Sequence, residues 1–327
     1  MFKGILLTQN DGATVAAYTE LTESQLPPGD VEVDVEWSTL NYKDGLAITG
    51  AGPVVRSWPM VPGIDFAGTV RTSSHPDFQP GQRVVLTGWG LGETRWGGLA
   101  ARARVEAGWL LPLPESLSTR SAMIFGTAGV TAALCVMALQ KHGVQPGDGE
   151  ILVTGAAGGV GSVAVALLAG LGYPVVASTG RSEEASYLSA LGASRIIERA
   201  SLSAAGKPLQ RELWAAVVDS VGSHTLANAC AQTRINGAVA ACGLAQGADF
   251  PATVMPFILR GINLYGINSV YQSNDQRSLA WQLLARHVSA ERLALMAHEI
   301  PLSQAIAVAP DVLAGRTRGR TLVAVGA

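Results

Sequence analysis

The sequence is poor in charged residues and in lysine, and these shortages argue against a nucleic-acid-binding protein. Charged residues make up 15% of the 327 residues, and the formal net charge is −2. Only four of the 23 basic residues are lysines. The chain therefore has no basic field that would attract nucleic acid, and it contains no nucleic-acid-binding motif. We expect no nucleic-acid partner.

Cysteine is equally scarce, with Cys135, Cys230 and Cys242 as its only representatives. Their odd number and wide spacing exclude a disulfide framework and a cysteine metal site. Cys242 is expected to be a small buried residue at the end of an apolar strand. The five histidines are scattered, and we interpret all of them as structural. His298 and Glu299 are adjacent, so they would face in different directions on the helix expected there.

Long hydrophobic runs are missing, because glycine and polar residues interrupt every apolar stretch. The apolar residues 5–7 give way to polar residues at 9–11, which is too short for a signal-peptide core. We expect no membrane segment and a cytoplasmic location. Apolar residues are nevertheless abundant at 48%, so a chain of this length can bury the cores of two domains.

The first hundred or so residues have the pattern of a β-rich domain. Residues 31–37 alternate between apolar and mostly acidic side chains, as a half-buried strand does. Residues 61–70 and 83–86 are predicted to be further strands. Turns rich in proline and glycine separate them, at 27–30 and 79–82.

From residue 118 the pattern becomes helical and then alternates between strand and helix. Ser118 is expected to cap a helix over 120–124, and a second helix is expected over 128–142. The later alternation is typical of a doubly wound parallel sheet, so the fold class is α/β. The predicted strands are 151–154, 173–177, 215–218 and 238–242, and the predicted helices are 160–171 and 183–191. A helix over 276–298 and a strand over 319–325 complete the chain.

A glycine-rich stretch at 155–161 follows the first of these strands and opens a helix. Its small residues let the backbone approach a pyrophosphate, and the helix N-terminus supplies free N–H groups. The spacing Gly-x-x-Gly-x-x-Gly is a variant of the dinucleotide fingerprint. A tight packing turn is the alternative, but the flanking strands and helices favour a nucleotide site.

The second strand of this region predicts the choice of cofactor. An NAD site carries an acid about twenty residues after the loop, which binds the ribose hydroxyls. Ser178 and Thr179 occupy that place here, and Arg181 follows. Hydroxyls and a guanidinium suit a 2′-phosphate, so NADPH is favoured. The alternative is that Arg181 is solvated and an acid at 183–184 binds the ribose, although Ser182 is better interpreted as the N-cap of a helix that begins with those acids.

At this point the sequence resembles a known superfamily. A β-rich domain, a nucleotide domain and a returning tail are typical of the medium-chain dehydrogenase/reductase superfamily. Residues 156–161 are similar to its quinone oxidoreductase branch. Residues 38–44, 62–68, 86–90, 253–260 and 319–323 add a resemblance to the acrylyl-CoA reductase (NADPH) group.

The resemblance implies the domain organisation. A GroES-like catalytic domain is expected over 1–122, with 266–327 returning to it, and a Rossmann NADP-binding domain over 123–265. Zinc alcohol dehydrogenases have a cysteine where this chain has Asn41 and a His-Glu pair where it has Ile64 and Asp65. Residues 86–110 also contain no cysteine for a structural zinc lobe. We therefore expect no metal.

The resemblance also implies the activity, which is hydride transfer from NADPH to the C=C bond of acryloyl-CoA to give propionyl-CoA. A quinone oxidoreductase and a non-catalytic NADPH-binding protein remain as alternatives. A homodimer through an edge strand near 263–267 is implied as well. The arginines open to the CoA phosphates are Arg56, Arg71, Arg102, Arg104 and Arg260, which the sequence does not rank.

Tyr42 is the candidate catalytic or cofactor-contacting residue, with a packing aromatic as the alternative. Asn41 and Asp44 are expected to fix its loop. Asp65 is expected to be structural, with orientation of Lys43 or Tyr42 as the alternative. The resemblance implies these cofactor contacts: Tyr42, Ala157, Gly158, Gly159, Val160, Thr179, Gly180, Arg181, Ser220, Leu244, Ile258, Ser269 and Arg320. The alternative for Arg320 is a surface arginine.

Overall fold

The computed structural model describes residues 1–326, which divide into two compact units. Unit 1 comprises Met1–Thr127, Val270–Ser278 and Met296–Ala327, and unit 2 comprises Ala128–Ser269 and Leu279–Leu295. Residues 123–127 therefore group with the first unit rather than with the nucleotide domain. Residues 279–295 belong to unit 2, although the whole tail after 266 was expected to return to the first domain.

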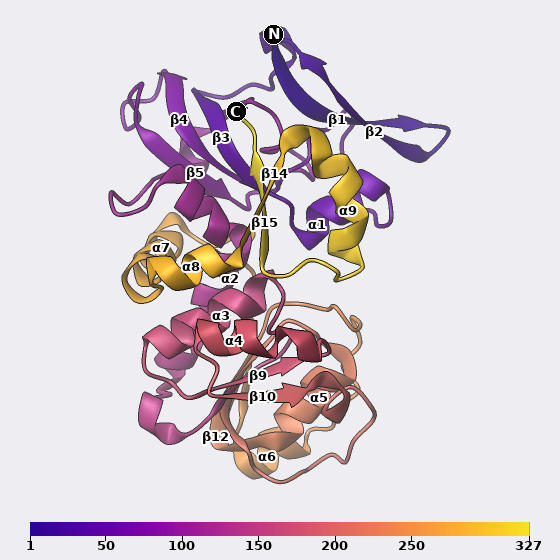
Figure 1. Cartoon of the computed structure of the whole chain (residues 1–327), viewed down its shortest axis with the longest axis vertical. Coiled ribbons are helices and arrows are strands. Elements are labelled where there is room, and N and C mark those ends of the chain that lie inside the picture. Colours follow the sequence, from indigo (N-terminus) through magenta and orange to yellow (C-terminus); the bar gives the residue numbers. More distant parts are fainter. Residues whose placement is uncertain (327) are drawn as a thin grey trace. The chain divides into compact units, whose positions relative to one another are not determined.

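Unit 1 is built on a seven-stranded sheet in the order β14-β15-β3-β4-β5-β7, with β6 paired to β3. Its strands are β3 (Val31–Thr39), β4 (Asp65–Ser73), β5 (Arg83–Thr87), β6 (Arg102–Val105), β7 (Leu111–Pro112), β14 (Ala297–Pro301) and β15 (Arg320–Ala324). A separate hairpin joins β1 (Phe2–Asn10) to β2 (Ala13–Leu21) (Figure 1). Val31, Val33 and Val35 on β3 are buried, because alternate side chains face the core.

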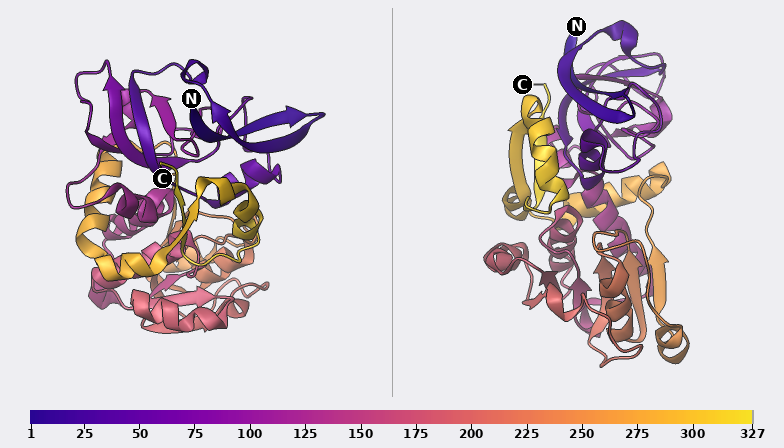
Figure 2. Two further views of the ribbon diagram at one scale, coloured as in Figure 1. Left: turned by 45° about the horizontal axis from the view of Figure 1, so that its top comes forward. Right: turned by 90° about the vertical axis from the view of Figure 1, so that its right-hand side faces the viewer.

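Two helices belong wholly to unit 1, α1 (Tyr42–Thr49) and α9 (Ala305–Leu313). Figure 2 shows α9 beside β14, both near the C-terminus. A Cβ placed on Gly45 would lie 2.9 Å from the Leu313 side chain, so glycine lets the two helices approach closely. This contact fixes α1, which begins at the candidate site residue Tyr42.

Unit 2 contains the predicted parallel sheet, with six strands in the order β10-β9-β8-β11-β12-β13. The strands are β8 (Ile151–Val153), β9 (Val175–Thr179), β10 (Arg195–Glu198), β11 (Trp214–Asp219), β12 (Thr233–Ala241) and β13 (Asn263–Gly266). The helices that follow them are α3 (Gly159–Gly170), α4 (Ala185–Leu191), α5 (Ser223–Gln232) and α6 (Met255–Arg260) (Figure 1). Central strands β8, β9 and β11 are wholly buried, which explains their continuous apolar runs. The α/β fold class is confirmed.

The helix α2 (Thr119–His142) joins the two predicted helical stretches. The Ser121 N–H donates to Ser118 Oγ at 3.0 Å, so the predicted cap is confirmed. Gly126 interrupts the helix with φ 51° and ψ −155°. The expectation that no segment could span a membrane is wrong for α2 by length and composition alone. Because 89% of its apolar window is buried in the protein, α2 fits a core helix.

Several predicted boundaries are wrong. The helix expected over 276–298 is two helices, α7 (Asn274–His287) and α8 (Ala290–Met296), because Ser289 caps a new start by accepting from the Arg292 N–H at 3.3 Å. His298 and Glu299 therefore lie on β14 and not on a helix. Strand β4 begins at Asp65 rather than 61, after a turn in which Gly63 has φ 104°. Strand β9 begins at Val175 rather than 173, directly after Pro174.

Candidate active site and cofactor site

The glycine turn of unit 2 connects β8 to α3, and three of its glycines meet different constraints. Gly155 has φ 60°, and a Cβ there would lie 2.5 Å from Ser220 Oγ. A Cβ on Gly161 would lie 2.3 Å from the Gly155 carbonyl oxygen. At Gly158, the N-cap of α3, a Cβ would meet only the Gly155 oxygen at 3.3 Å. The turn is thus tight on its inner side, while Gly158 leaves room for a ligand at the helix N-terminus.

The end of β9 lies against this turn, as predicted. The Ala156 N–H donates to the Ser178 carbonyl at 3.1 Å. Arg181 Nη2 donates to the Ala157 carbonyl at 3.2 Å, and Arg181 Nη1 lies 3.8 Å from the Glu184 carboxylate. The structure therefore brings 157–160 and 179–181 together. Ser182 is not a side-chain cap, because it lies inside a 3₁₀ turn, Ser182–Glu184, that precedes α4.

Ser178 presents a buried polar atom at the same edge. Its side chain is 1% exposed, and its Oγ has no hydrogen-bond partner among residues 1–326. Buried hydroxyls are nearly always hydrogen-bonded in folded proteins. This atom is therefore suited to a polar ligand at the edge of the sheet.

Arg199 is a further candidate cofactor-binding residue at this edge of the sheet, and it was not predicted from the sequence. It follows β10, and a Cβ built on Gly180 would lie 2.8–3.0 Å from the Arg199 guanidinium. The side chain is exposed and has no ion pair in the described part of the chain. The polar, half-buried β10 was not predicted as a strand, so nothing placed Arg199 beside Gly180. The signal that could have identified Arg199 is that it is a cation at the carboxyl end of a strand next to β9, where parallel sheets bind ligands.

The side chains of Asp219 and Ser220 form hydrogen bonds that join the ends of two neighbouring strands. Asp219 is fully buried and accepts from Thr154 Oγ1 at 2.6 Å and from the Gly222 N–H at 2.8 Å. Burial raises the pKa of Asp219, and these hydrogen bonds oppose the shift. Ser220 Oγ donates to the Thr154 carbonyl at 3.1 Å. Both side chains therefore hold the edge where β8 and β11 end.

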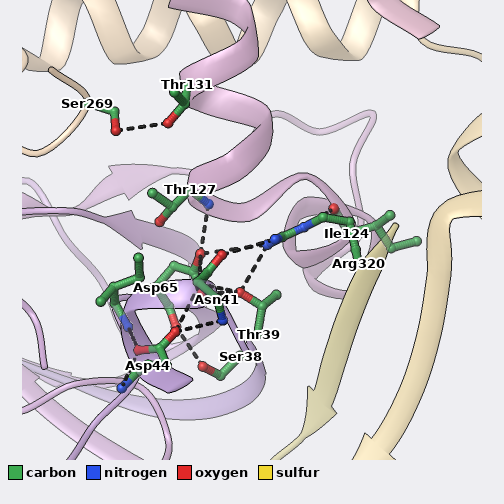
Figure 3. A network of polar contacts seen from close by, with 12 residues as sticks. Ser38, Thr39, Asn41, Asp44, Asp65, Ile124, Thr127, Thr131, Ser269 and Arg320 are labelled. Carbon is green, nitrogen blue, oxygen red and sulfur yellow. Dashed lines mark hydrogen bonds and ion pairs between the residues drawn. The ribbon is translucent and has the colours of Figure 1, made fainter. Parts of the chain in front are cut away.

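The remaining predicted contacts of unit 2 differ in exposure. Leu244 and Ile258 are 61% and 71% exposed, so their side chains are available to a ligand. Ser269 Oγ accepts from Thr131 Oγ1 at 2.8 Å (Figure 3). Cys242 is only half-buried, so the expectation of a fully buried residue is wrong; its Sγ lies 3.3 Å from the Asp219 carbonyl.

Unit 1 contains a buried polar cluster centred on Asp65 (Figure 3). Asp65 is fully buried and accepts from Thr39 Oγ1 at 2.5 Å, from the Thr127 N–H at 2.7 Å and from Asn41 Nδ2 at 3.2 Å. Arg320 Nη2 lies 4.0 Å from this carboxylate. Four buried polar side chains are thus joined in one cluster.

Arg320 is buried inside unit 1, so the alternative of a surface arginine is wrong. It donates to the Ile124 carbonyl at 3.0 Å, to Asn41 Oδ1 at 3.0 Å and to Thr39 Oγ1 at 3.1 Å. Burial lowers its pKa, and the charges of Asp65 and Asp44 oppose that shift. Each of its three nitrogens donates one hydrogen bond within unit 1, and its role as a cofactor contact stays a prediction.

Asp44 fixes the loop that precedes Tyr42, as expected. Its Oδ1 accepts from the Gly63 and Ile64 N–H groups at 3.1 and 3.0 Å, and its Oδ2 accepts from the Asn41 N–H at 2.9 Å. Asn41 and Asp44 together form the capping box of α1. Burial, and then the charge of Asp65, raise the pKa of Asp44 to about 7.

Tyr42 is the first residue of α1 and is 50% exposed, which does not fit a packing aromatic. Asp65 does not orient Lys43, because Lys43 Nζ donates to Glu93 Oε1 at 2.7 Å instead. The zinc-ligand positions are held by Asn41, whose amide is hydrogen-bonded at both ends, and by the apolar Ile64. In residues 1–326 no three His, Cys, Asp or Glu side chains form a group that could hold a metal ion.

Comparisons with known proteins agree with this architecture. A family model described as alcohol dehydrogenase GroES-like domain matches residues 27–115, and one described as zinc-binding dehydrogenase matches residues 159–286. The chain is 54% identical to "Probable acrylyl-CoA reductase AcuI" of Escherichia coli strain K12, over 99% of both chains. It is 51% identical to "Acrylyl-CoA reductase AcuI" of Ruegeria pomeroyi, over 100% of both chains.

Solved structures give the same result. The yhdH oxidoreductase of Salmonella enterica in complex with NADP is 53% identical, with a TM-score of 0.97 and 99% of both chains covered. The Bacillus subtilis protein yhfP with NAD bound is 41% identical, with a TM-score of 0.96 and 99% of both chains covered. Relatives of similar fold have thus been solved with either dinucleotide.

A GroES-like unit and a Rossmann unit with a glycine turn are the two domains of the medium-chain dehydrogenase/reductase superfamily. Because identity to two acrylyl-CoA reductases exceeds one half over the full length, the chain belongs to the acrylyl-CoA reductase group of that superfamily. The resemblance predicted from the sequence is confirmed.

Proposed function

We propose that this protein is a zinc-independent, NADPH-dependent reductase that converts acryloyl-CoA to propionyl-CoA. The observation that carries the proposal is the full-length identity of 51–54% to the two acrylyl-CoA reductases. We also propose a cytoplasmic location, as predicted from the sequence.

The residues of unit 2 fit NADPH. The turn at Gly155–Gly161 leaves space at the N-terminus of α3, where free N–H groups suit a pyrophosphate. Ser178 offers a buried hydroxyl without a partner among residues 1–326, and the guanidinium groups of Arg181 and Arg199 flank Gly180. Two cations beside the ribose position suit a 2′-phosphate. When bound, NADPH would supply the hydride that adds to the β-carbon, and a proton added at the α-carbon would complete the reduction of the C=C bond.

The residues of unit 1 position the candidate catalytic group. The cap formed by Asn41 and Asp44 holds the first turn of α1, so the exposed Tyr42 ring starts from a fixed backbone. As the substrate is reduced, negative charge develops on its thioester oxygen, and a hydroxyl donor stabilises that charge. We assign this role to Tyr42. Ile258 and Ser269 are proposed to contact the nicotinamide side and Ser220 the adenine or ribose, and Leu244 is proposed to contact the cofactor after the end of β12.

We further propose a homodimer that forms through β13. This strand is the last in the sheet order of unit 2, so one side of it has no strand partner in the described chain. An unpaired edge can add a strand from a second copy. The neighbouring α6 also exposes Leu259, at 57%. Sedimentation should give twice the chain mass of 33.8 kDa, and replacing Leu264 on β13 with proline should give monomers.

The activity is tested by NADPH oxidation with acryloyl-CoA, crotonyl-CoA, a quinone and an aldehyde. We expect the highest kcat/KM with acryloyl-CoA. A quinone preferred by tenfold or more would make the protein a quinone oxidoreductase. Tight NADPH binding without turnover of any substrate would make it a non-catalytic binding protein.

The absence of a metal requirement is tested separately. Dialysis against a chelator should leave kcat unchanged, because Asn41 and Ile64 replace the zinc-binding residues of alcohol dehydrogenases. Elemental analysis should find zinc well below one equivalent. Activity that is lost on dialysis and restored by zinc would contradict the proposal.

A further inference from the structure

The structure ranks the arginines that are open to a CoA phosphate. Arg71 pairs with Asp34 at 3.6 Å, and Arg102 pairs with Glu23. Arg104 pairs with Glu32 at 2.6 Å, and Arg260 donates to the carbonyls of 231 and 233. The Arg56 side chain is exposed and makes no hydrogen bond or ion pair within residues 1–326. Of the five candidates, Arg56 is the one whose charge is not compensated.

Arg56 lies on a loop with a fixed backbone. Its N–H donates to the Glu93 carbonyl at 2.8 Å, and Ser57 Oγ donates to the Thr94 carbonyl at 3.3 Å. The segments around 56 and 93 therefore run side by side. The Glu93 carboxylate is bound to Lys43, the residue next to Tyr42, and so does not neutralise Arg56. A cation is thus held beside the segment that carries the candidate catalytic residue.

Arg95 adds a second uncompensated cation, on the segment around 93 that runs beside Arg56. Its Nη1 donates to the Trp89 carbonyl at 2.7 Å, and its guanidinium stacks over the Trp109 ring at 4.1 Å. In the described chain it pairs with no carboxylate. Because stacking and one hydrogen bond hold the group in place, its other N–H groups are pre-oriented for an anion.

The backbone next to Arg95 is strained, which is a separate observation. Trp89 has φ 55°, a conformation that few residues other than glycine adopt, and it lies between Gly88 and Gly90, both at φ 78°. The Trp89 indole nitrogen is buried and has no hydrogen-bond partner among residues 1–326. Strain and unsatisfied donors concentrate at ligand-binding loops.

We propose that Arg56 and Arg95 bind phosphate groups of the CoA moiety and so make the protein selective for CoA thioesters. This inference rests on the proposed function. CoA carries three phosphates, and guanidinium forks bind phosphate with two parallel hydrogen bonds. The phosphates of NADPH are assigned to the glycine turn and the arginines of unit 2, so the cations of unit 1 serve the other substrate.

The experiment compares acryloyl-CoA with acryloyl-N-acetylcysteamine, a thioester that has the same reacting carbons and no phosphate. Arg56→Ala should raise the KM for acryloyl-CoA about tenfold, as the loss of one charge-assisted contact does, and Arg56→Glu should raise it further. The KM values for the short thioester and for NADPH should change less than about twofold. Arg71→Ala, which removes a charge already paired with Asp34, is the matched control and should change none of them.

The outcomes separate the two proposals. If Arg56→Ala raises the KM values of both thioesters equally, or of neither, the phosphate site is overturned while the reductase stands. A rise in the KM for NADPH alone would also overturn it, because the arginine would then bind the cofactor. Wild-type protein that reduces neither thioester would instead refute the proposed function.

Discussion

Two arginines, Arg320 in unit 1 and Arg199 in unit 2, differ in what surrounds them, and the difference separates a structural charge from a ligand-binding charge. Arg320 in unit 1 is 3% exposed, and oxygen atoms of Thr39, Asn41 and Ile124 accept from its three nitrogens. Arg199 in unit 2 is exposed beside Gly180 and has no ion-pair partner in the described chain. A buried and fully hydrogen-bonded charge holds a fold together, whereas an open charge beside a cofactor turn is available to an anion.

The largest effect is expected from removing the buried arginine, Arg320. Arg320→Ala leaves Asp65 buried without its cation, so we expect the free energy of unfolding to fall by about 3–5 kcal/mol. Urea unfolding followed by circular dichroism measures the change. Arg316→Ala is the control, because its partner Asp311 lies on the surface and the expected loss is below about 1 kcal/mol. Equal losses for the two variants would contradict the structural role of the cluster.

A substitution at Gly126 tests the same cluster through a backbone position that lies beside Arg320. Its φ of 51° and ψ of −155° suit glycine, and a Cβ would lie 2.5 Å from Arg320 Nη2. Gly126→Ala should therefore lower the free energy of unfolding by about 3 kcal/mol. Gly147→Ala, where a Cβ would meet nothing within 4 Å, should change it far less. Thermal unfolding of both variants provides the measurement, and an unaffected Tm for Gly126→Ala would show that the cluster tolerates the methyl group.

Removing the two arginines that flank Gly180 in unit 2 should affect cofactor choice and not stability. Arg181→Ala and Arg199→Ala should each raise the KM for NADPH about ten- to a hundredfold, because a charge-assisted contact with the 2′-phosphate is lost. NADH kinetics should barely change. Steady-state kinetics with both cofactors measures this, and Arg195→Ala, whose partner is Glu150, serves as control.

Three results would revise the NADPH assignment. Equal weakening of NADH and NADPH by Arg181→Ala would mean that the residue only supports the turn through the Ala157 carbonyl. An effect confined to Arg199→Ala would mean that Glu184 neutralises Arg181. A wild-type preference for NADH would refute the assignment itself.

A last prediction concerns pH and Asp44, and its effect per pH unit is small. Its pKa is raised from 3.8 to about 7, so between these values the folded state binds a proton that the unfolded state releases. The contribution of this group to stability is therefore largest at low pH and declines as pH rises towards 7. Asp44→Asn should flatten that dependence between about pH 4 and 7. The slope of the unfolding free energy against pH is the measurement, and an unchanged slope would assign the dependence to other groups such as Asp219, whose pKa is also raised.

The sequence predicted the features that arise from local pattern. The glycine turn, the parallel sheet and the position of Arg181 all follow from residues close together in the chain. The surroundings of Arg320 and Arg199 were not predicted, because they depend on contacts with residues that are remote in sequence, such as Asn41 and Gly180. A single arginine at the end of a strand has the same local sequence whether it is buried or exposed. The break at Ser289 was missed, although the spacing of the buried apolar residues changes there, from four residues between Leu284 and Val288 to five between Val288 and Leu293.

The stacking of Arg95 on Trp109 gives the proposed phosphate site an optical reporter of its own. A cation 4.1 Å from an indole ring changes the emission of that ring, and an anion that draws the guanidinium away alters the effect. Titration with CoA should therefore shift tryptophan fluorescence without any added label. The change should disappear in Trp109→Phe, even though six other tryptophans remain of the seven in the chain. Binding to unit 1 can in this way be followed independently of NADPH absorbance.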